Sequence, residues 1–428
     1  MLIGIGGVFL LTILLGVPIA FGMGLAGAGW ILLVERLEAG VLARRMYYTL
    51  DAFPLISVPL FIMIGFLAEQ SGLLPQLVRW VQFLLGKARG GVAYLNVLNS
   101  MVFAGISGTA ISDIASLGRI EIDLMRRAGY ELPYSAALTA ATSICGPIIP
   151  PSVAMILYAL AAGNISIGGL FMAGALPGVI LGLGMIVMCW FKARRGHYGV
   201  LLERPPRREL LMCTVRVLPL LALPVLIVGG VVSGVFTVTE SAAVGVVYTL
   251  LLGFVVTREL TWHHLYDAVV FSGVVSSVLG VLMGSGMIVS WIFTRNRVTH
   301  QLTELLVGWS HSPIAFMCLV AITLLVLGSV MDATAIIVAL TPLVAPIAAQ
   351  YGIHELQFGL VFVFTCMVGL VTPPVGVVLF MVCALVNISM ETLSRAIVPF
   401  VIWMVFVVVL LIFVPPITLF LPGLVGFR

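Results

Sequence analysis

Two short segments of this 428-residue chain combine glycine, proline and hydroxyl side chains within otherwise apolar sequence. The first runs from Gly105 to Ala110 (GISGTA), and the second runs from Gly146 to Ser152 (GPIIPPS). The adjacent prolines Pro150 and Pro151 remove two N–H donors, so carbonyl groups upstream of them lose their helical partners. A hard cation such as Na⁺ binds several oxygens, which free carbonyls and Ser or Thr hydroxyls supply. We interpret both segments as helix breaks that offer oxygens to a cation and helix N-termini to an anion.

The same pattern returns later, from Gly328 to Thr334 (GSVMDAT) and from Gly369 to Pro374 (GLVTPP). Asp332 lies in a long apolar tract, where an unpaired carboxylate costs about 2.5 to 3.5 kcal/mol at the bilayer centre. It must therefore ligate a cation, cap a half-helix or pair with another group. One Pro-Pro break alone is more typical of a kinked helix packed through small residues. Two such breaks, each after its own Gly-rich and hydroxyl-rich segment, favour binding sites.

Other polar residues of the apolar tracts are less informative. Asp113 follows the first segment, but Arg119 and Glu121 come soon after it, so we expect Asp113 near the membrane interface. Asn164 and Asn387 follow the two Pro-Pro breaks and could bind a substrate or satisfy backbone groups; the sequence leaves both open. No HExxH motif, Cys/His cluster or nucleophile–base set occurs, so we do not expect an enzyme.

The amino-acid composition indicates that these segments lie in a membrane. Charged residues make up 9% of the chain and hydrophobic ones 61%, whereas a soluble domain is about 25% charged. The chain is therefore predicted to be a polytopic membrane protein. It has 21 Lys and Arg against 17 Asp and Glu and no basic run with interleaved aromatics, so nucleic acid is not an expected partner. Only helices satisfy their own backbone groups in lipid, so we predict an all-α fold.

The few charges mark three further segments. The basic linker 192–216 contains Lys192, Arg194 and Arg195, and the positive-inside rule places it in the cytoplasm. Residues 35–50 alternate apolar and charged side chains with helical spacing, as in an amphipathic helix at the membrane interface. Residues 258–267 are predicted to form a second, shorter interfacial arm.

The chain also contains an internal repeat with an offset of 223 residues. At this offset Gly105 corresponds to Gly328, Gly146 to Gly369, and Asn164 to Asn387, and residues 105–166 need no gap. We divide the chain into a first repeat (1–191), the cytoplasmic linker (192–216) and a second repeat (217–428). The hairpin and broken helix occupy about 90–166 in the first repeat and about 305–390 in the second.

Each repeat is predicted to cross the membrane an odd number of times, which inverts the second repeat relative to the first. Both chain ends then lie outside the cell. Inverted repeats with matching broken helices are typical of secondary transporters, in which two inverted halves exchange inward and outward shapes around one site.

Together, GISGTAISDIASLG, GPIIPPS, GVFTVTESAAV and FGLVFVFTCMVGLVTPPVG resemble the large membrane subunit of tripartite ATP-independent periplasmic (TRAP) transporters. The similarity extends over essentially the whole chain. One departure is Thr365, where family members often carry Asn.

The resemblance implies an elevator-type, ion-transporter-like fold with re-entrant hairpins, in the bacterial inner membrane. It implies import of an organic anion, usually a carboxylate, coupled to Na⁺ and without a cofactor. The implied partners are a small four-helix membrane subunit (Q type) and a periplasmic substrate-binding protein (P type). The sodium-binding residues carry over to Ser107, Thr109, Gly146, Ile149, Pro151, Gly328, Asp332, Thr334, Gly369, Thr372 and Pro374. With substrate between the two hairpin tips, we expect contacts from Ser107, Gly108, Ser152, Asn164 and Asn387.

Other functions remain open at this point. A self-sufficient sodium/carboxylate symporter of related fold would need neither partner protein. A purely structural subunit would gain nothing from paired broken helices.

Overall fold

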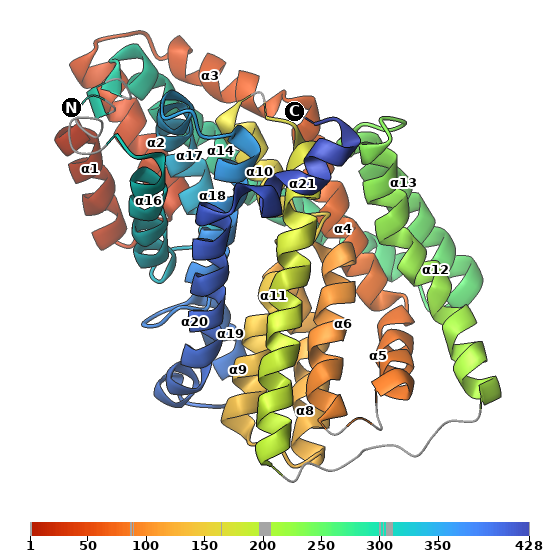
Figure 1. Ribbon diagram of the computed structural model, residues 1–428. Coiled ribbons are helices and arrows are strands. Elements are labelled where there is room, and N and C mark those ends of the chain that lie inside the picture. Colours follow the sequence, from red (N-terminus) through yellow and green to blue (C-terminus); the bar gives the residue numbers. More distant parts are fainter. Residues whose placement is uncertain are drawn as a thin grey trace.

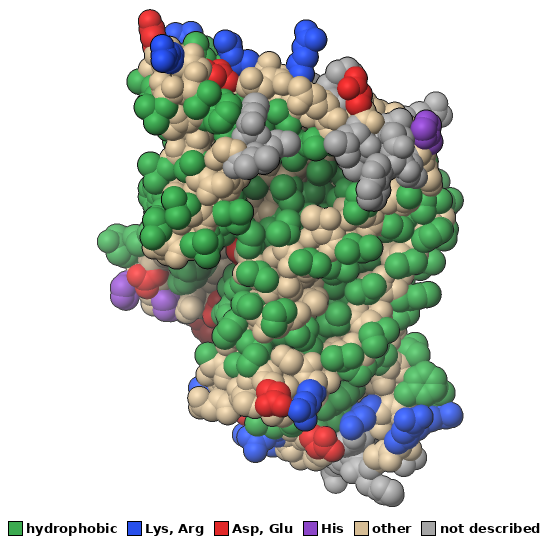
Figure 2. All heavy atoms as spheres, turned by 90° about the vertical axis from the view of Figure 1, so that its left-hand side faces the viewer, with side chains coloured by type: hydrophobic (Ala, Val, Ile, Leu, Met, Phe, Trp, Pro, Cys, Tyr) green, Lys and Arg blue, Asp and Glu red, His purple; other side chains and the backbone are tan. Residues whose placement is uncertain are grey.

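The computed structural model describes residues 2–85, 88, 90–163, 165–196, 207–298, 301–302, 304 and 311–427. Within these ranges every regular element is helical, as expected where lipid offers no partner to a sheet edge. Seven of the described helices are long and apolar enough to cross a membrane. Apolar side chains form a broad band on the surface, with Lys and Arg gathered toward the two ends and a smaller group of acidic and histidine side chains at mid-height on the left (Figure 2). The chain is thus built as a multi-pass membrane protein.

The first half of the chain contains long helices interrupted by short 3-10 and π turns. Its elements are α1 (Leu2–Leu14), α2 (Ile19–Gly29), η1 (Trp30–Val34), α3 (Gly40–Leu50), η2 (Phe53–Ile56), α4 (Ser57–Gln70), α5 (Leu73–Leu85), α6 (Gly91–Ser107), α7 (Ala110–Asp113), η3 (Ile114–Gly118), α8 (Arg119–Arg127), α9 (Leu132–Thr142), η4 (Ser143–Cys145), α10 (Val153–Ala162) and α11 (Ile167–Arg195).

The second half is built in the same way. Its elements are α12 (Arg207–Val232), α13 (Val238–Leu251), η5 (Leu252–Thr257), α14 (Trp262–Arg295), α16 (Pro313–Gly328), α17 (Ala333–Gln350), α18 (Glu355–Gly369), α19 (Val377–Val386), α20 (Met390–Phe413) and α21 (Pro415–Val425).

Corresponding helices of the two halves keep the offset of the sequence repeat. The helix α17 begins and ends 223 residues after the α7–α8 segment, and α20 begins 223 residues after α11. In space, α6, α8 and α9 occupy the lower half of the molecule, whereas α16, α17 and α18 occupy the upper half (Figure 1). The hairpin α6–α8 and the hairpin α16–α17 therefore enter the protein from opposite ends.

Helix packing separates two groups of elements. In the first group α14 packs against α2, α3 and α4, and α13 packs against α4 and α12. In the second group α9 packs against α6 and α20, and α18 packs against α16 and α17. The groups meet where α5 lies on α6 and α14 lies on α17. At this boundary Gly65 of α4 approaches Ser107, and a Cβ at Gly65 would lie 3.3 Å from the Ser107 Cα.

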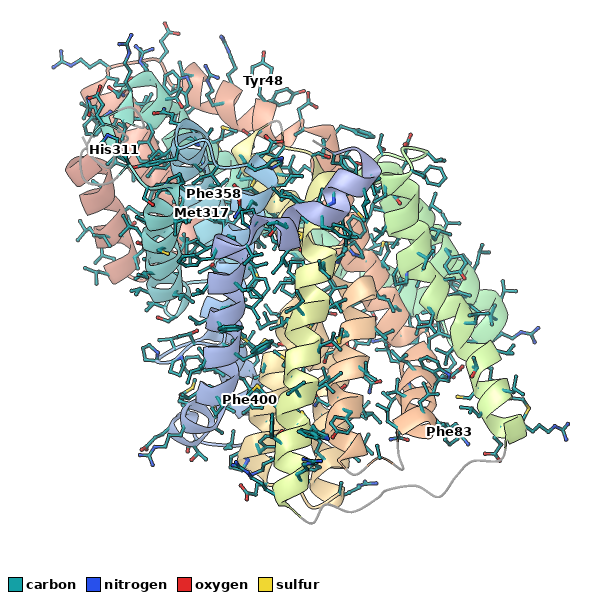
Figure 3. The ribbon with its side chains drawn as sticks, viewed as in Figure 1. Tyr48, Phe83, His311, Met317, Phe358 and Phe400 are labelled. Carbon is teal, nitrogen blue, oxygen red and sulfur yellow. The ribbon has the colours of Figure 1, made fainter. Side chains whose placement is uncertain are left out.

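The two predicted arms differ in structure. The first arm is the helix α3, which packs on α14 and leaves Tyr48 66% exposed at the upper end of the molecule (Figure 3). The predicted second arm, 258–267, is not a separate short helix, because residues from Trp262 onward are the first turns of the continuous helix α14. Pro54 ends the first arm segment, whereas the residue 223 positions later is Ser277, which continues a helix.

Both ends of the predicted linker 192–216 are helical, because α11 extends to Arg195 and α12 begins at Arg207; residues 197–206 lie outside the described residues. Basic side chains in the last turn of α11 suit the negative end of its helix dipole. The chain ends lie toward the upper part of Figure 1, opposite the adjoining ends of α11 and α12.

Candidate functional site

The first hairpin turns at Gly108, between the end of α6 at Ser107 and the start of α7. Gly108 has a φ of 62°, a left-handed conformation that glycine adopts without a steric penalty. Thr109 is extended and caps α7, because its Oγ1 accepts a hydrogen bond from the Ser112 N–H at 3.2 Å. One helix thus ends and the next begins within two residues, which leaves the Ser107 carbonyl without a helical partner.

The first break is held in shape by Ser152. Its buried Oγ donates a hydrogen bond to the Pro147 carbonyl at 2.6 Å and accepts one from the Met155 N–H at 3.2 Å. Ser152 therefore caps α10 and has both hydrogen-bonding functions in use.

Three carbonyl groups in the first break stay free. Among the described residues, no hydrogen bond ends on the carbonyl oxygens of Gly146, Ile149 or Pro151. The Gly146 carbonyl lacks a helical partner because Pro150 has no N–H. The Val153 and Met155 N–H groups, which would pair with Ile149 and Pro151 in a helix, bond to Gly108 and Ser152 instead. These oxygens are the type of ligand that a hard cation takes from unwound backbone.

The first tip and the first break are in direct contact. The Val153 N–H donates to the Gly108 carbonyl at 3.4 Å. A Cβ on Gly146 would lie 2.7 Å from the Thr109 carbonyl oxygen, so only glycine allows this approach. Ser107 is 2% exposed and its hydroxyl donates weakly to the Thr109 carbonyl, at 3.5 Å. The tip and the break thus bring predicted sodium ligands of the first repeat into one cluster.

The second repeat forms a similar junction. Gly328 at the end of α16 meets Gly369 at the end of α18 so closely that a Cβ on Gly328 would lie 2.9 Å from the Gly369 Cα. The Gly376 N–H donates to the Ser329 carbonyl at 3.0 Å, which fastens this break to its hairpin tip. Within the described residues the carbonyl oxygens of Gly328, Thr372 and Pro374 accept no hydrogen bond.

Asp332 is the N-cap of α17. Its Oδ1 accepts a hydrogen bond from the Thr334 N–H at 2.9 Å and another from the Thr334 hydroxyl. No described Lys, Arg or His forms a salt bridge with it. Of the three roles that the sequence leaves open, the helix cap is therefore realised, and the second carboxylate oxygen remains available to a cation.

The two junctions are linked by crossed packing. The helix α10, which follows the first break, packs on α17 and α18 of the second half, and α19, which follows the second break, packs on η3 and α9 of the first. Met317 of α16 and Phe358 of α18 lie together in the upper half of the molecule, and Phe400 of α20 lies in the lower half (Figure 3). Each short helix therefore ties its own break to the opposite hairpin.

The structure does not bring every expected substrate residue to the tips. Asn387 is an exposed left-handed residue that ends α19, about 15 Å along the helix from the second break. Asn164 lies outside the described residues. The buried hydroxyl of Ser152 is already committed to its cap, so Ser107 and Gly108 remain as the tip residues of this set.

Asp113 lies elsewhere than expected. It is 1% exposed, and so is Glu121; both acids belong to the core of the first hairpin and not to an interface. Sequence reasoning missed their polar neighbours Asn96, Asn99 and Ser100 on α6. Their spacing of three and four residues in an apolar run places them on one helix face, which was a usable signal.

Fold and junctions together define an all-helical, multi-pass membrane protein with two interrupted hairpins. The structure matches that of the Alcanivorax borkumensis YdaH transporter with a TM-score of 0.66, over 88% of this chain and 89% of that chain, at 16% sequence identity. At that identity the likeness concerns the fold alone.

The family model for the DctM component of tripartite ATP-independent periplasmic transporters matches residues 6–417, and the chain belongs to this family. It is 32% identical to the sialic acid TRAP transporter large permease protein SiaM of Vibrio cholerae, over 96% of this chain and 95% of that protein. It is 34% identical to the isethionate TRAP transporter permease protein DctMQ of Oleidesulfovibrio alaskensis, over 97% of this chain but only 66% of that protein. The protein is a transporter permease and not an enzyme.

Proposed function

We propose that this permease imports an organic anion, in our expectation a carboxylate, driven by a sodium gradient across the bacterial inner membrane. The observation that carries the proposal is the pair of tip-and-break junctions, each with free carbonyl oxygens beside hydroxyl or carboxylate oxygens. Ser107, Thr109, Gly146, Ile149 and Pro151 would hold one Na⁺. The second set is Gly328, Asp332, Thr334, Gly369, Thr372 and Pro374.

The substrate would bind between the tips, near Ser107 and Gly108. Two related permeases support an anionic cargo, since sialic acid is a carboxylate and isethionate a sulfonate. The helices α7, α10 and α17 begin at the junctions and direct N–H groups toward them, which suits an anion bound beside cations.

Transport would proceed by an elevator movement. The group containing both hairpins would slide against the group containing α4 and α14, past the close contact of Gly65 with Ser107. We place the basic residues at the end of α11 in the cytoplasm and both chain ends in the periplasm.

Two partners complete the proposed system. The relative DctMQ is longer than this chain, and its name supports a small Q-type membrane subunit, which would be a separate four-helix protein here. A P-type periplasmic binding protein would select and deliver the substrate.

Uptake into proteoliposomes tests the proposal. The permease, its small membrane subunit and the binding protein loaded with a radiolabelled anion are assayed with an inward gradient of Na⁺ or, as control, of K⁺ at equal ionic strength. We expect uptake only with Na⁺ and only with the binding protein. Uptake that is the same in K⁺ contradicts sodium coupling, and uptake without the binding protein favours a self-sufficient symporter.

A further inference from the structure

The first hairpin has a fully buried polar interior that the two ion junctions do not use. Seven polar side chains from three helices meet there, each no more than 1% exposed. They are Asn96, Asn99 and Ser100 of α6, Asp113 and Glu121 of the α7–α8 segment, and Thr139 and Thr142 of α9.

Most of this interior is hydrogen-bonded. Ser100 donates to Asp113 Oδ2 at 2.9 Å, and the Ser100 and Thr142 hydroxyls lie 3.2 Å apart. Thr142 donates to Asn96 Oδ1 at 2.9 Å, and Asn96 Nδ2 donates to the Thr139 hydroxyl at 2.7 Å. Asp113 is therefore connected to a chain of neutral partners that runs from α6 to α9.

Glu121 and Asn99 are different. The Asn99 amide lies beside the Glu121 carboxyl group, yet Oε1 and Oε2 of Glu121 and Oδ1 and Nδ2 of Asn99 complete no hydrogen bond with any described residue. Buried polar atoms are nearly always paired. Neither oxygen of Glu121, however, receives a donor from the residues that the structure describes.

No positive charge compensates the two acids. Among the described residues neither Asp113 nor Glu121 has a salt bridge, and Arg119, Asp123, Arg126 and Arg127 of α8 are exposed. The titratable side chains on the packed elements are Tyr94 of α6, Tyr134 of α9, Cys145 of η4 and Cys383 of α19. Of these, Cys145 faces Asp113, while Tyr94 and Tyr134 face Cys189 of α11.

We propose that Glu121 holds a proton inside the first hairpin, beside the amide of Asn99. Protonation gives the carboxyl group an O–H donor, for which Asn99 Oδ1 is an adjacent acceptor without a partner among the described residues. An ionised carboxylate would lie in an apolar core with no described donor to either oxygen and no positive partner, which is costly. The nearby Asp113 also disfavours a second negative charge.

A sodium ion fits these atoms less well. It would take the carboxylate and Asn99 Oδ1 as ligands, but it would repel the adjacent Nδ2–H group. Ser100 donates to Oδ2 of Asp113, whose Oδ1 has no partner among the described residues, whereas neither oxygen of Glu121 has a described donor, which makes Glu121 the acid that needs the proton most.

The hairpin fold does not require this interior. In the second repeat, α16 contains neither Asn nor an acid, and residues Ile336 and Val344 occupy the positions of Asp113 and Glu121 at the offset of 223. The polar pair is thus an addition to one hairpin. It makes that hairpin, which carries an ion junction at its tip, responsive to protons independently of what the junction binds.

Infrared spectroscopy of the purified full chain tests the proposal. We expect a protonated carboxyl C=O band near neutral pH that shifts in deuterium oxide, is lost in Glu121→Gln and is kept in Asp123→Asn, the exposed control on the same helix. Identical bands in the wild type and in Glu121→Gln overturn the proposal. A wild-type band that appears only after Na⁺ is removed overturns it in favour of a cation site.

A second measurement keeps the proposal testable if the band is obscured. The wild-type melting temperature should fall as the pH rises above about 4.3, the usual pKa of an unfolded glutamate, because native Glu121 then keeps a proton that the unfolded chain has lost. This fall should disappear in Glu121→Gln and in the apolar double variant Asn99→Leu/Glu121→Leu. A fall of equal size in the wild type and both variants contradicts a proton at Glu121.

Discussion

Replacing Asp332 by asparagine separates the two contributions that this residue makes, the helix cap and the charge. Asn and Asp are comparable N-caps, and the amide oxygen of Asn can still accept the Thr334 N–H that now donates to Oδ1 at 2.9 Å. The variant Asp332→Asn should therefore fold as the wild type does. Asp332→Ala removes the cap as well and should cost about 1 kcal/mol of stability.

The expected effect on sodium follows from the loss of charge. A bond to a charged group contributes about 1.5 to 3 kcal/mol, whereas a neutral one contributes about 1 kcal/mol. If the free carboxylate oxygen of Asp332 binds Na⁺, Asp332→Asn weakens sodium binding by about 0.5 to 2 kcal/mol, or about 2- to 30-fold.

The assay is anion uptake into proteoliposomes as a function of Na⁺ concentration, together with thermal melting in Na⁺-free buffer. Thr237→Ala is the matched control, because Thr237 caps α13 with a capping box outside both junctions. It should lower the melting temperature and leave the Na⁺ dependence unchanged. The reasoning is refuted if Asp332→Asn keeps the wild-type Na⁺ dependence, or if it is destabilised as much as Asp332→Ala.

Three further substitutions test the first junction. Ser107→Ala should lower the apparent Na⁺ affinity about tenfold, which corresponds to about 1.4 kcal/mol of binding free energy. The melting temperature should change little, because the one hydrogen bond of the Ser107 hydroxyl is 3.5 Å long. An unchanged Na⁺ titration contradicts this prediction. Ser152→Ala should destabilise the protein by about 1 to 2 kcal/mol in a denaturant titration, since both hydrogen bonds of its hydroxyl are buried; a wild-type midpoint would exclude the capping role. Gly108→Ala should abolish uptake, because the new Cβ would lie 2.7 Å from the Pro151 carbonyl oxygen. The control Gly129→Ala should keep uptake, because Gly129 also has a positive φ but has open space around it. Equal uptake by the two variants would show that the close approach at Gly108 does not matter.

Much of the fold is encoded locally and could be predicted from the sequence. The apolar composition requires membrane helices, and the uncharged stretch 132–191 is broken where Gly146 to Pro151 and Gly163 to Gly169 indicate, giving α9, α10 and α11. The breaks are predictable because a proline lacks an N–H wherever the chain places it. Pro54 likewise lacks an N–H and ends the first arm segment, whereas the corresponding residue of the second half, Ser277, has one and lies within the continuous helix α14.

The chemistry of individual side chains depended on neighbours that the sequence does not place. Ser107 and Ser152 are both hydroxyl residues in glycine-rich or proline-rich segments. The Ser107 hydroxyl forms one weak hydrogen bond, whereas the Ser152 hydroxyl caps α10 and has no hydrogen-bonding function left for a ligand. Asn387 matched Asn164 in the repeat, but its position at the end of α19 makes it a left-handed helix terminus.

By itself, the sequence determined that this chain is a membrane protein of two related halves with paired helix breaks, because charge content, prolines and a constant offset act without regard to folding partners. Only the tertiary structure decided that Asp113 and Glu121 are buried, since the charged residues that follow them along α8 face outward while α6 and α9 close over the two acids. It also decided that each short helix packs on the opposite hairpin. Burial and pairing are set by segments far apart in the chain, and these meet only when the helices pack.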